Sequence, residues 1–237
     1  MTASQVSLAL IQQHTLFQDV PIEALRQILE NGQVIRLSEG DTVFRQGDTA
    51  SRFYVLLQGN LKIAQTTPSG EQVTVRHVNP GEIFGIARAM QRTTFPATSI
   101  VMRESLILSW PNNYWDTLLK LNPRFAQSTF ETVGQRLQDA HSRIRELSTD
   151  EVEQRVAKAL LRMVKDSGVN TTDGIEIGYP VTRQDIAELT GTTLHTVSRL
   201  LSNWKTKGLV ISGRRRITIT SIDGLQALIN DPDQPNT

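Results

Sequence analysis

The chain has 237 residues, long enough for one large or two modest domains, and its 38% hydrophobic and 21% charged residues are typical of a globular protein. It has no cysteine, which excludes disulfides, thiolate iron–sulfur clusters, zinc–cysteine sites and cysteine nucleophiles. The formal net charge is +1, so any charge that attracts nucleic acid must be local.

No apolar stretch approaches the roughly 18 residues that a membrane-spanning helix needs. Residues 1–10 lack the basic region and apolar core of a secretion signal. We therefore expect a cytoplasmic protein without a membrane partner.

The first 120 residues predict a helical start followed by a compact β structure. Residues 21–29 place Ile22, Leu25, Ile28 and Leu29 on one helical face. Afterwards, short runs of β-branched and aromatic residues alternate with turn residues. The predicted strands are 42–44, 53–57, 61–64, 73–75, 99–102 and 106–110. Turns at this spacing are typical of an antiparallel barrel or roll.

A long helical pattern follows the predicted strands. Its apolar residues are spaced alternately three and four apart, which is the heptad spacing of paired helices. These residues are Phe130, Val133, Leu137, Ala140, Ile144 and Leu147. The seam is short for a free coiled coil but sufficient for a dimer helix supported by neighbours. A helix packed on its own domain is the alternative.

Residues 147–150 are predicted to form a hinge. Residues 149–153 resemble a capping box that opens another helix, with an apolar face from Val152 to Met163. Gly168 is expected to end this helix.

Residues 182–201 match a helix-turn-helix, for which a plain pair of antiparallel helices is the alternative. Thr182 is expected to cap the first helix, with Asp185 answering it at the third position. Ala187 is small enough for the second helix to cross closely, and Gly191 supplies the tight turn. The arrangement leaves the polar residues of the second helix available to base edges and phosphates.

Residues 209–220 predict a β-hairpin wing with three arginines at its tip. Residues 182–220 hold seven basic and two acidic residues, a local excess of five positive charges that suits phosphate contacts. For the arginines alone, a solvated turn is the alternative. The predicted DNA-binding residues are Thr182, Arg183, Thr192, Thr193, His195, Thr196, Ser198, Arg199, Lys205, Arg214, Arg215 and Arg216.

Across nearly its whole length the chain resembles the cAMP receptor protein/FNR family of bacterial transcription regulators, nearer the FNR and nitric-oxide-responsive branch. The resemblance is carried by FYVLLQGNLK at 53–62, VNPGEIFG at 78–85 and VTRQDIA at 181–187. It implies an α+β protein with an N-terminal cyclic-nucleotide-binding-like β-roll, a long dimerisation helix and a C-terminal winged helix-turn-helix. It further implies a homodimer on palindromic double-stranded DNA, with RNA polymerase as another partner.

The domains expected from this resemblance follow the order of the predicted elements. They are a sensory roll with N-terminal helices over 1–120, a dimerisation helix over 121–148, a DNA-binding domain over 149–228 and a disordered tail over 229–237.

The resemblance fails at the pocket where some family members bind cAMP. Those members carry Gly-Glu, then Arg-Ser for the cyclic phosphate, and Thr-Ser on the dimer helix. This chain has Gly85-Ile86, Pro96-Ala97 and Ala140-His141 at the matching positions. A phosphate is best held by a guanidinium, so we expect an effector other than cAMP, with Arg88 and Arg92 available to another anion. The candidate pocket residues are Phe84, Gly85, Ile86, Arg88, Arg92, Pro96, Ala97, Ala140 and His141.

The cofactor is left unknown. An FNR-type iron–sulfur cluster is excluded by the lack of cysteine, and no metal site is predicted. The histidines His14, His77, His141 and His195 leave haem ligation open, and constitutive activity controlled by abundance is a further alternative.

The competing function is a ligand-sensing roll that regulates an enzyme or partner protein rather than DNA. The helix-turn-helix and the basic wing favour the DNA-binding regulator. We do not expect an enzyme, because the sequence has no phosphate loop, nucleophile elbow or convincing catalytic triad.

Overall fold

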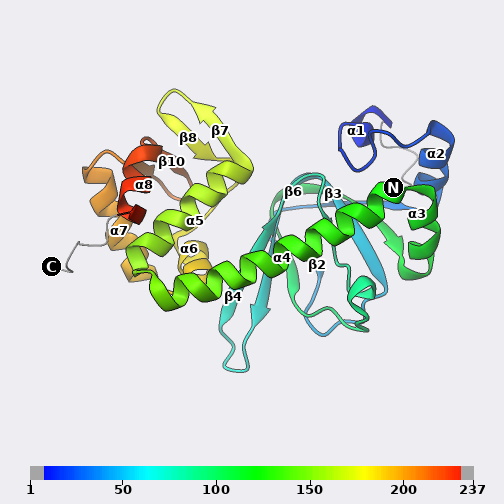
Figure 1. The fold of residues 1–237 in the computed structure, drawn as a ribbon, viewed down its shortest axis with the longest axis horizontal. Helices are drawn as coiled ribbons and strands as arrows, with labels where there is room; N and C mark the ends of the chain where they lie inside the picture. Colours follow the sequence, from blue (N-terminus) through cyan, green and yellow to red (C-terminus); the bar gives the residue numbers. More distant parts are fainter. Residues whose placement is uncertain (1–7, 231–237) are drawn as a thin grey trace. The chain divides into compact units, whose positions relative to one another are not determined.

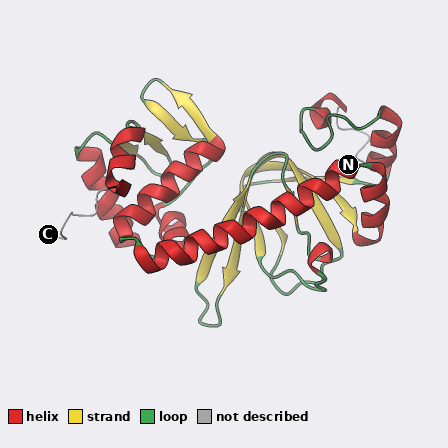
Figure 2. Ribbon diagram, viewed as in Figure 1, coloured by secondary structure: helices red, strands yellow, loops and turns green. Residues whose placement is uncertain are grey.

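The computed structural model describes residues 8–230 of the chain. The chain divides into two compact units between residues 139 and 140 (Figure 1). Both units contain helices and strands (Figure 2), which confirms the predicted α+β class.

The helices of the first unit precede and follow its strands in the sequence, except η2 (Arg88–Met90), which lies between the last two strands. The helices are α1 (Leu8–Gln12), α2 (Ile22–Glu30), the short η2 and η3 (Asn112–Tyr114), α3 (Trp115–Leu121) and α4 (Pro123–Thr149), which continues into the second unit. The apolar face expected on α2 is only partly buried. Leu25, Ile28 and Leu29 lie in the core, whereas Ile22, the first residue of the helix, is 53% exposed.

The strands of the first unit form one antiparallel sheet that folds into a roll. They are β1 (Gln33–Leu37), β2 (Thr42–Phe44), β3 (Arg52–Thr66), β4 (Gln72–Val78), β5 (Ile83–Phe84) and β6 (Thr98–Pro111). The strand order is β1-β6-β3-β4, with β2 also paired to β6 and β5 to β3. The sequence analysis did not predict β1 or β5.

The strands β3 and β6 are each longer than predicted. β3 joins the predicted strands 53–57 and 61–64, and β6 joins 99–102 and 106–110. The glycine expected to turn the chain, Gly59, instead lies at an irregularity where the β3–β6 register shifts between Leu56 and Leu61. Its φ of +97° is a conformation that glycine adopts readily, and a Cβ there would collide with Ser105. Gly59 therefore marks a bulge rather than a turn.

Aromatic rings fill the interior of the roll. Phe44 stacks on Phe95 with ring centroids 3.9 Å apart, and Tyr54 stacks on Phe84 at 5.1 Å. Gly85 lies against these rings with a φ of +66°, and a Cβ there would lie 2.6 Å from Cδ2 of Tyr54. The backbone at Gly85 is therefore pressed against the aromatic core.

The second unit holds the remaining helices and a second sheet. Its elements are α5 (Val152–Ser167), β7 (Gly168–Thr171), β8 (Gly174–Ile177), α6 (Arg183–Thr190), α7 (Leu194–Thr206), β9 (Val210–Ser212), β10 (Ile217–Ile219) and α8 (Ile222–Asn230). The strand order is β7-β8-β10-β9, so the hairpin β7–β8, which was not predicted from the sequence, extends the wing into a sheet. Because α8 ends at Asn230, residues 229 and 230 are helical rather than part of the expected tail. The rest of that tail, 231–237, lies outside the described residues.

Replacing Gly85 by alanine should destabilise the roll more than the same change at Gly70. Both glycines have positive φ, 66° and 87°, but the space around Gly70 is open within 4 Å whereas Gly85 faces Tyr54. Positive φ costs each alanine roughly 1–2 kcal/mol, and overpacking adds about 1–3 kcal/mol at Gly85 alone. Urea unfolding of Gly85→Ala and Gly70→Ala measures the difference. Equal losses would show that Gly85 is not pressed against the rings.

Candidate nucleic-acid interface

The first helix of the candidate interface, α6, begins at a reciprocal cap. The backbone N–H of Asp185 donates to Oγ1 of Thr182 at 3.0 Å, and the backbone N–H of Thr182 donates to Oδ2 of Asp185 at 2.9 Å. Asp185 is only 7% exposed, and its carboxylate is stabilised by the hydrogen bond from the backbone N–H of Thr182. This confirms the cap predicted from the sequence.

A tight turn joins α6 to α7. Gly191 ends α6 in the left-handed conformation, with φ of +63°. Thr193 then caps α7, because its Oγ1 accepts from the backbone N–H of Thr196 at 3.2 Å. The tight turn predicted at Gly191 is therefore confirmed.

One face of α7 is fixed in the core of the second unit. Val197, Leu200, Leu201 and Trp204 are buried, and Nε1 of Trp204 donates to Oε1 of Glu153 on α5 at 2.7 Å. Burial of this face determines which residues of α7 point outward.

The polar residues predicted to contact DNA divide into two groups by exposure. Thr193, His195, Arg199, Lys205 and the three wing arginines are exposed, and Thr182, Arg183, Thr192, Thr196 and Ser198 are half-buried. His195 and Arg199 are four residues apart on α7 and share its exposed face. Arg183 of α6 reaches Ser198 of α7, with 3.4 Å between Nη1 and Oγ. The structure thus gathers the α6 and α7 candidates along one pair of helices.

The wing differs from expectation at Arg216. This residue was predicted to contact DNA, but its Nε and Nη2 donate to the carboxylate of Glu176 on β8, at 3.1 and 2.5 Å. Arg216 therefore ties the wing hairpin to the hairpin β7–β8. Arg214 and Arg215 occupy the exposed turn, and Arg215 has a φ of +95°, which is unusual for a residue other than glycine.

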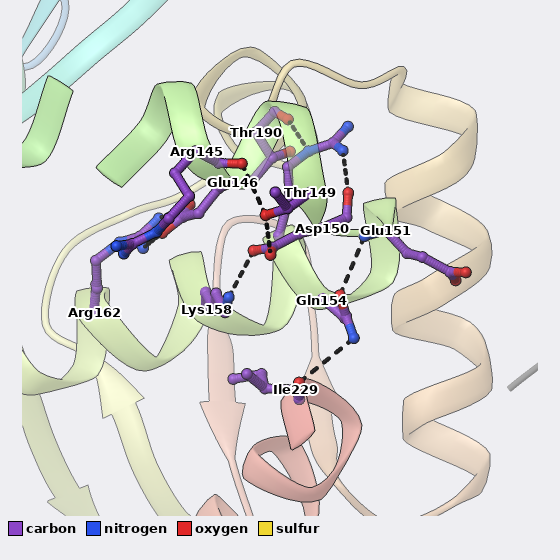
Figure 3. Close-up of polar contacts among 11 residues, drawn as sticks. Arg145, Glu146, Thr149, Asp150, Glu151, Gln154, Lys158, Arg162, Thr190 and Ile229 are labelled. Carbon is purple, nitrogen blue, oxygen red and sulfur yellow. Dashed lines mark hydrogen bonds and ion pairs between the residues drawn. The ribbon is translucent and has the colours of Figure 1, made fainter. Parts of the chain in front are cut away.

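The junction between α4 and α5 connects the long helix to α6 (Figure 3). Arg155 donates from Nε to the carbonyl oxygen of Thr190 at 3.1 Å and from Nη1 to that of Asp150 at 2.9 Å. Asp150 also pairs with Lys158, with 2.6 Å between Oδ2 and Nζ. The guanidinium of Arg155 thus bonds both to the last residue of α6 and to Asp150, which lies between α4 and α5.

The predicted hinge at 147–150 and its capping box need correction. α4 continues to Thr149, whose Oγ1 donates to the carbonyl oxygen of Arg145 at 2.9 Å, so the break is confined to the residues around Asp150. The box that opens α5 is formed by Glu151 and Gln154, and the sequence analysis placed it at Thr149. Glu146 further ties α4 to α5 by accepting from Arg162 at 2.6 and 3.2 Å.

The candidate effector residues are distributed differently from the prediction. Phe84, Ile86 and Ala97 are buried and Pro96 is half-buried, so they contribute to packing. Arg88 pairs with Asp116 of α3, with 2.8 Å between Nη2 and Oδ2. Arg92 is exposed, as are Ala140 and His141 on α4. The apolar candidates are divided between two parts of the core, because Phe84 packs in the cluster of Phe44 and Tyr54 whereas Ile86 packs in that of Trp110.

Arg76, Glu82 and Arg136 form a charged cluster that was not predicted from the sequence. Nη1 of Arg76 lies 2.7 Å from Oε2 of Glu82, although the two residues are separated by a turn in the sequence. Arg136 on α4 interacts electrostatically with both. The opposite charges of Arg76 and Glu82 were visible in the sequence, but their half-buried position beside Arg136 was not.

The seam predicted on α4 lies at the surface of the described chain. Phe130 is 78% exposed, Leu137 58% and Ile144 63%. Val133 and Leu147 are also exposed, and Ala140 lies between them on the same face. Isolated exposed apolar residues are common in soluble proteins, but a continuous stripe of this kind marks an interaction surface.

Two features are absent from residues 8–230. No helix among them combines the length and the apolar character needed to span a membrane. The same residues contain no group of three or more histidine, aspartate or glutamate side chains placed to hold a metal ion.

Comparison with known families and proteins agrees with this geometry. Residues 34–122 match the cyclic nucleotide-binding domain, and residues 154–228 match the Crp-like helix-turn-helix domain. The chain is 28% identical over 189 residues to the global nitrogen regulator of Synechococcus elongatus, covering 79% of this chain and 85% of that protein. It is 26% identical over 208 residues to the transcriptional activator protein FnrA of Stutzerimonas stutzeri, covering 87% and 84%. The structure of FixK2 from Bradyrhizobium japonicum matches with a TM-score of 0.72 at 20% identity, covering 83% and 96%.

Removing the α6 cap should destabilise the helix-turn-helix. Thr182→Ala deletes the oxygen that accepts from Asp185, and such a loss costs about 1 kcal/mol of the free energy of unfolding. Ser202→Ala is the matched control, because this exposed residue lies within α7 and caps neither helix. Chemical unfolding followed by tryptophan fluorescence measures both. An unchanged stability for Thr182→Ala would contradict the role of this cap.

Proposed function

This chain belongs to the cAMP receptor protein/FNR family of DNA-binding transcription regulators, and we propose that it acts in the cytoplasm as a homodimer on palindromic DNA, with RNA polymerase as a further partner. The observation that carries the proposal is the pair α6–α7, whose buried face leaves His195 and Arg199 exposed together. The exposed arginines of the neighbouring wing are suited to the phosphate backbone.

We assign α7 as the helix that enters the major groove. Arg199 has a planar guanidinium that matches O6 and N7 of guanine. Members of the family usually carry glutamate four residues earlier, where this chain has His195. Glutamate accepts from N4 of cytosine, whereas neutral histidine either donates or accepts and is less selective. The half-site therefore keeps one guanine contact and departs from the family's usual sequence beside it.

The remaining DNA contacts are assigned by exposure and position. Thr193, Thr196 and Ser198 are placed at base edges or adjoining phosphates, and Thr182, Arg183 and Thr192 at the junction of the two helices. Lys205, Arg214 and Arg215 would contact the backbone. Phosphate contacts of this kind position the protein without reading sequence.

The seam on α4 supplies the proposed dimer contact. Pairing two copies along this stripe removes the exposed side chains of Phe130, Leu137 and Ile144 from water. The pairing also relates the two α7 helices by a two-fold axis, which places half-sites about one helical turn apart.

The sensory domain is proposed over residues 1–120, which lie within the first unit. The dimerisation helix over 121–148 and the DNA-binding domain over 149–228 keep the limits expected from the sequence. An effector other than cAMP is favoured, because Pro96 and Ala97 supply no guanidinium for a cyclic phosphate and Gly85 already contacts the aromatic core. The cofactor remains unassigned, with haem left open.

Charged residues in the seam should prevent dimerisation. We expect Leu137→Asp combined with Ile144→Asp to give a monomer by light scattering and to abolish tight operator binding, because burying unpaired carboxylates is costly. Gln138→Asp combined with Arg145→Asp is the control, since it places the same residues one position further along the exposed helix. A dimer that persists in the seam variant would remove the seam from this account.

Arg199 and Arg215 should affect DNA binding in different ways. Arg199→Ala should cost about 1–3 kcal/mol and relax the preference at one guanine per half-site. Arg215→Ala should weaken binding to all sequences alike and shallow the salt dependence. Selection from random DNA at two salt concentrations measures both effects.

Lys165→Ala, an exposed change on α5, serves as the control for this selection. If Arg199→Ala selects the same motif with undiminished guanine preference, α7 is misplaced in the groove. If the wild type selects no motif, the roll-based regulator of a partner protein replaces the DNA-binding function.

A further inference from the structure

His195 occupies the position on α7 where members of the family usually carry glutamate. It lies in the first turn of the helix, is exposed, and shares its face with Arg199. Glutamate is ordinarily negative at neutral pH, whereas histidine is the side chain whose charge ordinarily changes between about pH 5 and pH 8. The exposed face of α7 therefore carries a group whose hydrogen-bonding capacity depends on pH.

The position of His195 is fixed by the cap and the core of the same helix. Thr193 caps the first turn, and Val197, two residues after His195, is fully buried. The Cβ atoms of residues four apart on a helix lie roughly 5–6 Å apart, and successive base pairs lie about 3.4 Å apart. When Arg199 contacts a guanine, the imidazole of His195 therefore lies beside a neighbouring base pair.

The carboxylates on the elements packed against α7 already have hydrogen-bond donors. On α6, Oδ2 of Asp185 accepts from the backbone N–H and the hydroxyl of Thr182 at 2.9 and 2.6 Å. Oε1 of Glu188 accepts from Nε2 of Gln184 at 3.2 Å, and Oε1 of Glu153 on α5 accepts from the buried indole of α7 at 2.7 Å. Neither α7 nor β9 contains aspartate or glutamate. A positive charge on the exposed imidazole is thus left for DNA to balance.

Arg199 and Arg183 are the positive groups on the same pair of helices. Arg199 lies one turn further along α7, and Arg183 on α6 reaches Ser198, with 3.4 Å between Nη1 and Oγ. Both oppose a further positive charge in the free protein. Bound DNA favours one, because a duplex carries about one negative charge per 1.7 Å of its axis. Protonation of the imidazole and binding of DNA therefore strengthen each other.

We propose that His195 makes the reading of DNA depend on pH: its protonated ring selects guanine at the base pair beside the one that Arg199 contacts, and its neutral ring does not. In the major groove, guanine presents the acceptors N7 and O6, whereas cytosine presents the N4 donor. A neutral ring has one donor and one acceptor and can bond to either base. A protonated ring has two donors, so it bonds to guanine and meets another donor at cytosine. This inference rests on the proposed function of α7.

The two N–H groups of a protonated imidazole point to opposite sides of the ring. One can donate to N7 or O6 of guanine while the other donates to a phosphate oxygen, and both bonds are then charge-assisted. Because the complex binds more protons than the free protein, affinity for the operator that carries this guanine rises as the pH falls.

The test uses operators that differ only at the base pairs beside the guanine that Arg199→Ala ceases to prefer. Each flanking pair is set in turn to guanine or to cytosine in both half-sites. Fluorescence anisotropy on the full chain gives the dissociation constants at about pH 5.5 and about pH 8, near the two ends of the ordinary range of histidine. At one of these pairs, the wild type should favour guanine about tenfold or more at the lower pH and less than about threefold at the higher pH. Each ratio is taken at a single pH, so effects of pH on folding or dimerisation cancel.

Two variants separate the charge of His195 from its shape. His195→Gln should give the same ratio at both pH values, because an amide keeps one acceptor and its donors throughout. His195→Lys should favour guanine at both pH values, because an ammonium stays charged across this range and suits the acceptors of guanine. His141→Gln is the matched control: this exposed histidine lies on α4, outside the helix-turn-helix, so the variant should keep the wild-type response.

The outcomes distinguish this inference from the proposed function. A wild-type ratio that stays the same at both pH values overturns the inference, and so does a change with pH that His195→Gln shares. Loss of the guanine preference in His195→Lys at both pH values would show that positive charge is not what selects the base. If the wild type selects no motif at either pH, the proposed function itself fails, whereas a selected motif without any response to pH removes the inference alone.

Discussion

Burial of one face of α7 is the constraint on which the DNA-reading geometry depends. Trp204 is fully buried and donates to Glu153 of α5, so the helix cannot rotate without breaking this hydrogen bond and exposing the indole ring. With that face fixed, His195 and Arg199 are directed outward together. The cap at Thr182 and the turn at Gly191 then set where α6 lies beside α7. The apolar packing of α7 thus decides which of its polar residues are available to DNA.

The junction around Asp150 gives this unit a means of responding to the long helix. Arg155 bonds to carbonyl oxygens of both Asp150 and Thr190, so one side chain joins the residue that follows α4 to the end of α6. Glu146 and Arg162 add a second tie between α4 and α5. A seam on α4 that pairs two copies would act on this connection. Energetic coupling between two sites needs contacts that connect them and an element that can adopt two arrangements.

The sequence was most informative where local chemistry alone decides the structure. The Thr182–Asp185 cap, the Gly191 turn and the seam on α4 depend on spacing and residue type, and the structure has the cap, the turn and an exposed seam. Prediction failed where distant contacts decide. Gly59 has the appearance of a turn but sits in a bulge because β6 supports it across the sheet. The Arg76–Arg136 cluster was invisible because burial of a charge depends on which elements pack around it, and sequence periodicity carries no information about that.

The most direct test of the central claim uses the absence of cysteine in the chain. Ser202→Cys places a unique thiol on the exposed face of α7, three residues from Arg199, for attachment of an iron chelate that cleaves nearby DNA. On a selected operator, the account predicts cleavage at two symmetric places in the major groove, about one helical turn apart. Cleavage at a single place, or none while the DNA remains bound, would contradict a two-fold dimer that reads DNA with α7.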